Sequence, residues 1–248
     1  MKKITIAFFA SILTISAFSQ VDAFTTTRGI LEINPVYHGS FWMKWNNLTI
    51  LVDPYGGADR FKAAGPADLV LITDIHGDHM DSSTLVNLDL KKATLVVPAA
   101  VATRLEKFLP ADISVRILNN GDSTEFSGLG LTAIPMYNLP DTSDSRHPKG
   151  RGNGYVLNLG DKRVYISGDT EDIPEMRSLQ QIDIAFLCMN KPYTMDEKQA
   201  AEAALAFKPA VVYPFHFRRP GGFSDVEEFA RLVKAGNPGI EVRIRKWY

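Results

Sequence analysis

The sequence predicts a single layered α/β domain in which helices cover packed sheets. Short apolar strands alternate with helices from residue 29 to the end of the chain, and turn residues separate them. No repeat period or linker divides this pattern. The chain has 248 residues, 45% hydrophobic and 22% charged, which is enough for one large core. One domain over residues 24–248 is therefore expected.

The first 23 residues differ in kind from this domain. A positive head, Met1-Lys2-Lys3, precedes an apolar stretch at residues 4–18, and small residues follow at 21–23. This pattern predicts a cleaved secretory signal over residues 1–23 and a periplasmic or secreted protein without a membrane contact after cleavage. The alternative, an uncleaved membrane anchor, is weaker because the apolar stretch is short for a membrane span.

The first half of the domain is expected to be rich in strands. Apolar runs bounded by turn residues predict strands at 31–33, 41–44, 48–52, 68–72, 94–97, 113–118, 123–126 and 129–135. Helices are expected at 82–88, where Asp81 reads as the N-cap, and at 99–108, which Pro110 closes.

A long polar loop at residues 138–153 separates the two halves. It is rich in Pro and Gly, and loops of that length inside a domain are usually functional or disordered. Strands are then expected at 155–159 and 163–167, joined by a Gly160-Asp161 hairpin. Further strands are expected at 184–187, 210–213 and 240–244, and helices at 173–179, 195–207 and 224–235.

Charge and cysteine content exclude some classes of function. The formal net charge is −1 and no basic run occurs, so a nucleic-acid partner is not expected. Cys188 is the only cysteine, so the chain has no internal disulfide. Its apolar neighbours at 184–187 favour a buried thiol over a nucleophile.

One short stretch carries most of the chemistry. Asp74, His76, Asp78 and His79 follow the apolar strand at 68–72 and lie within six positions. Adjacent residues on a strand point to opposite faces, so Asp78 and His79 can share a site only on a turn. The spacing favours a metal site over a polar loop that carries histidines by chance. The protein's other histidines, His38, His147 and His216, also lie in loops or at strand ends.

Together with Gly168-Asp169-Thr170 and His216, this motif resembles the metallo-β-lactamase-fold hydrolases. The segments 38–41 and 50–54 are similar to the opening hairpin of their ascorbate-6-phosphate lactonase-like branch. The resemblance covers roughly residues 29–220. It implies a four-layer αββα sandwich (the metallo-β-lactamase fold) with metal ions at one edge, between the two sheets.

The resemblance also implies a ligand set. Asp74 and His76 would belong to a first metal site, and Asp78, His79 and His216 to a second, with Asp169 shared between them. A metal-bound hydroxide would then attack an ester, lactone or phosphodiester bond. The alternative is a metal-binding or ligand-binding module of the same fold without turnover.

Two departures from the family pattern alter these expectations. Asp74 stands where the family has a histidine, and Asn138 stands near the position of another. His147 is expected to supply the missing imidazole, either as a ligand or as a proton donor, alongside Asp78 and Asp169 in catalysis; the alternative is an exposed loop residue without a role. The extra carboxylate makes manganese or iron as well as zinc candidates for one or two bound divalent ions.

Several neighbours are expected to support this site. Lys149, Arg218 and Tyr193 are candidates for binding a small-molecule substrate with an anionic group, although solvated loop charge or core packing are alternatives. His38, Asp53 and Asn138 are expected to contact the ligands and orient them, although a structural role for His38 and a turn cap for Asp53 are alternatives.

Overall fold

The computed structural model of the chain describes residues 21–248, and two seven-stranded sheets form its centre. The first sheet contains, in chain order, β1 (Asp22–Thr26), β2 (Gly29–Tyr37), β3 (Ser40–Trp45), β4 (Leu48–Val52), β5 (Leu69–Leu71), β6 (Thr94–Val97) and β7 (Ser114–Ile117). Strands β1 to β4 pair antiparallel, whereas β4 to β7 pair parallel.

The second sheet repeats this plan from the other end. Its spatial order is β16-β13-β12-β11-β10-β9-β8, with the β8 to β11 pairs antiparallel and the rest parallel. Its strands are β8 (Ser123–Phe126), β9 (Leu129–Met136), β10 (Gly152–Leu159), β11 (Lys162–Ile166), β12 (Ile184–Cys188), β13 (Val211–Phe215) and β16 (Glu241–Val242). A separate small hairpin joins β14 (Arg218–Arg219) to β15 (Gly222–Phe223).

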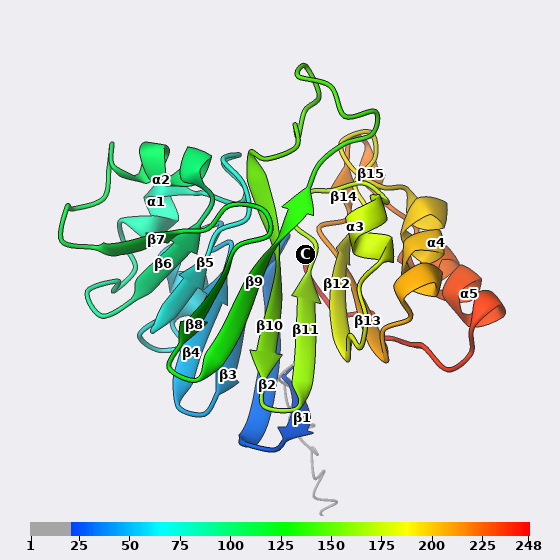
Figure 1. Cartoon of the computed structure of the whole chain (residues 1–248), viewed down its shortest axis with the longest axis horizontal. Coiled ribbons are helices and arrows are strands. Elements are labelled where there is room, and N and C mark those ends of the chain that lie inside the picture. Colours follow the sequence, from blue (N-terminus) through cyan, green and yellow to red (C-terminus); the bar gives the residue numbers. More distant parts are fainter. Residues whose placement is uncertain (1–20) are drawn as a thin grey trace, which may run out of the picture.

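The helices lie on the outer sides of the two sheets (Figure 1). In Figure 1, α1 and α2 lie beside β5 to β7, and α4 and α5 lie beside β12 and β13. The helices are η1 (Ala58–Phe61), α1 (Ser82–Leu85), α2 (Ala99–Leu105), α3 (Pro174–Arg177), α4 (Glu197–Phe207) and α5 (Val226–Gly236). Over residues 21–248, none of these helices has the length and apolar character that a membrane span requires.

Alternation along the strands produces the four layers. Ile50 and Val52 of β4 are buried in the large core between the sheets, whereas Leu51 faces a second core with Val70, Val101 and others beneath α1 and α2. Successive side chains of a strand point to opposite faces, so a strand buried on both sides reads as one apolar run. The predicted αββα sandwich is confirmed.

Several predicted element ends are wrong by a few residues. The helices expected at 82–88 and 99–108 end earlier because their last turns tighten into i→i−3 hydrogen bonds, as from the amide of Asn87 to Thr84 O. Helix α4 begins at Glu197 instead of 195 because Asp196 caps it, accepting from the amide of Gln199. Strand β16 is shorter than the expected 240–244, and β1, η1, β14 and β15 were not expected.

Most of the expected signal, residues 1–20, lies outside the described residues. Its last residues belong to the fold, because β1 begins at Asp22 and pairs with β2. The Asp22 carboxylate accepts hydrogen bonds from Arg245 Nη2 at 2.7 Å and Tyr213 Oη at 2.8 Å. A cut after residue 23 would remove these contacts.

Candidate metal centre

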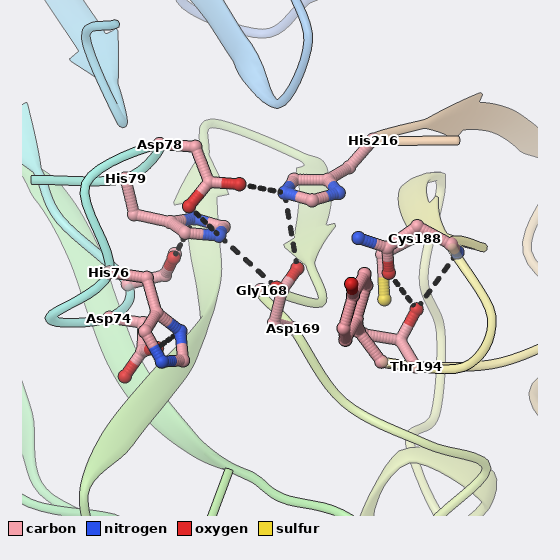
Figure 2. Close-up of polar contacts among 12 residues, drawn as sticks. Asp74, His76, Asp78, His79, Gly168, Asp169, Cys188, Thr194 and His216 are labelled. Carbon is pink, nitrogen blue, oxygen red and sulfur yellow. Dashed lines mark hydrogen bonds and ion pairs between the residues drawn. The ribbon is translucent and has the colours of Figure 1, made fainter. Parts of the chain in front are cut away.

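The candidate site lies where strands of both sheets end. Parallel strands β5, β11 and β13 direct their carboxyl ends to one edge, where the turn after β5 meets the Asp169 loop and His216 (Figure 2). Crevices at such strand ends are where α/β sheets bind ligands. His38 joins them from the turn between β2 and β3, where Gly39 is needed because a Cβ would lie 2.9 Å from the His216 ring.

The turn after β5 folds back as the sequence predicts. The amides of His79 and Met80 both donate to His76 O, and Asp81 caps α1 by accepting from the amide of Ser83. Its start is fixed by Thr73, whose amide and hydroxyl donate to the buried Asp53 carboxylate at 2.7 and 2.6 Å.

Three of the predicted residues form a first cluster. Potential ligand atoms of Asp74, His76 and His147 lie within 4.8 Å of one another. His76 Nδ1 is 2.6 Å from Asp74 Oδ2 but lacks hydrogen-bond geometry, as expected for two atoms aimed at a shared cation. The buried Asp74 carboxylate also accepts two hydrogen bonds from Arg151, at 3.1 and 3.0 Å. His147 therefore brings the long loop into the site.

A second cluster contains Asp169 and meets the first at this residue. Asp169 Oδ2 lies 3.3 Å from Nε2 of both His79 and His147, and Oδ1 lies 3.5 Å from Nε2 of His216. Asp78 completes the group, with Oδ2 3.4 Å from His216 Nε2 (Figure 2). One buried carboxylate thus lies between two sets of potential ligands.

Hydrogen bonds on the far side of two imidazoles show what these rings present to Asp169. His79 Nδ1 donates to Asp53 Oδ2 at 2.9 Å, and His147 Nδ1 donates to Asn138 Oδ1 at 3.0 Å. In the neutral ring, this tautomer leaves the lone pair of each Nε2 on the side of Asp169, where a metal ion would bind it. Both Nε2 atoms, together with His216 Nε2 and Asp169 Oδ1, are buried without a hydrogen-bond partner among residues 21–248. A cation at each cluster would satisfy these atoms, so the residues fit divalent metal ions.

The charges of the site agree with this fit. Burial alone would lower the pKa of His79, but Asp169, Asp53 and Asp78 raise it well above its usual value. The Asp169 carboxyl is buried as well, yet His216 and His79 hold its pKa well below the usual value. The carboxylates therefore stay ionised and favour positive charge between them.

Burial and neighbouring charges also set the pKa values of Asp74 and His38, at the edges of the site. Burial would raise the pKa of Asp74, but His76, His79 and Arg151 lower it to about 2. Burial, with the neighbouring His216, lowers the pKa of His38 to about 4, so that imidazole is neutral at pH 7.

A family model described as a β-lactamase superfamily domain matches residues 32–216. The chain belongs to this superfamily. It is also 32% identical to a UPF0173 metal-dependent hydrolase of Thermococcus onnurineus, over 74% of this chain and 84% of that protein. A crystal structure from Parabacteroides distasonis, designated a metal-dependent hydrolase, has a TM-score of 0.82 and 37% identity over 93% of this chain and 100% of that one. The metallohydrolase Igni18 of Ignicoccus hospitalis, at 23% identity, shares the fold with a TM-score of 0.73 over 87% and 95% of the chains.

This chain is thus a metal-dependent hydrolase of the metallo-β-lactamase superfamily. Beside its metal centre lies a pocket of about 290 Å³. The pocket is lined by His38, Asp78, Arg146, Asp169, Asn190, Tyr193, Arg218, Arg219 and Pro220. Arg146 lies 4.4 Å from the centre of the Tyr193 ring. Three arginines therefore line the same pocket as Asp78 and Asp169, two candidate ligands.

The structure places some of the expected supporting residues in the pocket, one outside it, and the rest against the predicted ligands. Arg218 and Tyr193 line the pocket. Lys149 does not line it, because its ammonium pairs with Glu175 at 2.6 Å and lies over the Tyr137 ring. Asp53, Asn138 and His38 each contact a predicted ligand.

Sequence reasoning missed Arg146 and the partner of Asp74. Arg146 immediately precedes His147, and this adjacency could have indicated that it lies at the site. The pairing of Arg151 with Asp74 leaves no local signal, because 77 positions separate the two residues. Cys188 is buried, as predicted, and burial raises the pKa of its thiol to about 12, which fits a structural role.

Proposed function

We propose that this hydrolase is an exported enzyme that holds one or two divalent metal ions and cleaves an ester, lactone or phosphodiester bond in a small anionic substrate. The convergence of two His/Asp clusters on the Asp169 carboxylate carries the proposal. Lactones are included because of the likeness to the ascorbate-6-phosphate lactonase-like branch.

The chain's own residues would prepare the centre for its ions. His147 fits a ligand better than a proton donor, because Asn138 engages its Nδ1 and its Nε2 faces Asp169. Three carboxylates and four imidazoles make a set that manganese, iron and zinc can all use. Bound metal ions would acidify water to supply the nucleophile and would stabilise the charge that develops on the substrate.

The arginines support an anionic substrate. Arg146 and Arg218 make no ion pair with a carboxylate within the described part of the chain, and both line the pocket. Planar guanidinium groups suit phosphate or carboxylate oxygens. We assign Lys149 to anchoring the loop through Glu175. R218M should raise the KM for an anionic substrate about 10- to 100-fold, whereas K149M should leave it near the wild-type value.

Export is supported by the sequence pattern at the N-terminus. We propose a periplasmic or secreted enzyme that acts on small molecules, with neither nucleic acid nor membrane as partner. Cell fractionation tests this proposal, and a full-length chain in the cytoplasm would contradict it.

The first experiment is to measure metal content and hydrolysis together. The wild-type protein should contain one or two metal equivalents and hydrolyse bis(p-nitrophenyl) phosphate or simple lactones, whereas D169A should lose both the metal and the activity. D172A is the matched control, because Asp172 lies three positions away and pairs with Arg177. Wild-type protein that binds no metal and hydrolyses neither substrate would refute the proposal.

A further inference from the structure

We propose that Tyr248 positions the Asp78 carboxylate for metal binding through the imidazole of His38. Tyr248 Oη lies 2.7 Å from His38 Nδ1, and His38 Nε2 lies 3.1 Å from Asp78 Oδ2. The three side chains form one continuous chain of hydrogen bonds that ends on a candidate ligand. This inference rests on the metal centre of the proposed function.

The direction of these hydrogen bonds follows from the donors available. The backbone amide of Arg218 donates to Tyr248 Oη at 3.0 Å, so the hydroxyl proton is free to be donated to His38 Nδ1. A ring that accepts at Nδ1 carries its proton on Nε2, and Nε2 donates this proton to Asp78 Oδ2. The reverse tautomer would turn a nitrogen lone pair toward a carboxylate oxygen at 3.1 Å, which is repulsive.

The backbone of His38 is held by the C-terminal residues next to Tyr248 and by His216. The His38 amide donates to Trp247 O at 2.9 Å, and the His216 amide donates to His38 O at 3.1 Å. His38 and His216 have φ angles of 59° and 49°, which side-chain-bearing residues adopt only when their surroundings hold them there. The buried Trp247 ring anchors the segment that supplies these contacts.

Asp78 needs this support more than Asp169 does. Its side chain is 34% exposed, against 5% for Asp169, so packing alone does not hold its carboxylate. A donor on Oδ2 restrains the rotation of the group and leaves Oδ1 on the side of His79, 3.9 Å from its Nε2. Partners that orient metal ligands in this way typically change metal affinity about 10- to 100-fold.

The test compares Y248F with a matched control, Y37F. Y248F removes the hydroxyl but retains the ring that packs against Phe217 and Phe223. Tyr37 belongs to the same aromatic group, with its ring 5.8 Å from that of Tyr248, and its hydroxyl bonds the Arg218 side chain instead of His38. In chelator competition with Zn²⁺, Y248F should raise the apparent Kd of one metal equivalent about 10- to 100-fold, whereas Y37F should leave it unchanged.

A second measurement identifies the tautomer of His38 directly. Nitrogen-15 NMR of histidine-labelled, metal-free wild-type protein should show His38 as the Nε2–H tautomer, and this preference should weaken in Y248F. The Nδ1–H tautomer in the wild type, wild-type affinity in Y248F, or an equal loss in Y37F would each overturn the positioning role. Wild-type protein that binds no Zn²⁺ would instead refute the proposed function, and this inference with it.

Discussion

Replacing Arg151 with methionine should destabilise the metal-free protein and tighten its metal binding. The guanidinium makes two hydrogen bonds to Asp74, which is fully buried, while the Arg151 side chain is 20% exposed. Breaking a buried ion pair costs about 3–5 kcal/mol, and the partial exposure of Arg151 favours the lower figure, about 3 kcal/mol. For a domain of this size, that loss corresponds to a fall in Tm of about 6–12 °C.

The metal-loaded protein should lose much less stability. A bound cation can take over the role of the guanidinium beside Asp74, and removal of a positive charge favours the binding of another. Thermal melts of R151M with EDTA and with excess Zn²⁺ should therefore differ by more than those of the wild type. R146M is the control, because it removes the same charge from the same loop. The Arg146 side chain contacts the Tyr193 ring and not Asp74. Equal losses for R151M in both melts, or an equal loss in R146M, would refute this reasoning.

Three further predictions concern other parts of the chain. D53N should weaken metal binding about 10- to 100-fold in chelator competition, because the amide no longer holds His79 in one tautomer; unchanged affinity would contradict this. D196A should cost about 1 kcal/mol at pH 7 in urea unfolding through loss of the α4 cap. Burial would raise the pKa of Asp196, but the Gln199 amide and Lys191 lower it, so its stabilisation is present above about pH 4 and is lost as pH falls through the folded pKa. The two proteins should thus converge at low pH, and a constant difference would count against this. N-terminal sequencing of exported protein should find a first residue before Asp22, since a start at residue 24 would remove the partner of Arg245.

The sequence predicted which His and Asp residues of the turn cluster because their signal is local. Asp74, His76, Asp78 and His79 lie on one turn, and the strand before it and the cap after it are both legible without any partner. The sheets were also predictable, since their strands read as short apolar runs between turn residues. The ends of elements were missed, because hydrogen-bond geometry and capping decide the last residue, and so were the short elements β1, η1, β14 and β15.

The sequence did not predict how the side chains around the candidate ligands are oriented. Lys149 and Arg151 lie two positions apart on one loop, yet one pairs with Glu175 outside the pocket and the other with Asp74 inside the site. The sequence pattern gives no reason to assign different partners to these two cations. The path of the loop decides which partner each one meets. The contact of Tyr248 with His38 spans 210 positions, and nothing near either residue indicates it.

The Asp74–Arg151 pair also explains how an aspartate can stand where the resemblance leads one to expect a histidine. A carboxylate with a bidentate guanidinium is close to neutral overall, like the imidazole it would replace. D74H alone should therefore lose a metal equivalent, because a metal-bound imidazole would face the unpaired guanidinium of Arg151. D74H combined with R151M should regain that equivalent. Metal content measured across the wild type, the two single variants and the double variant tests this coupling. If D74H alone keeps two equivalents, the aspartate and the arginine are independent of each other.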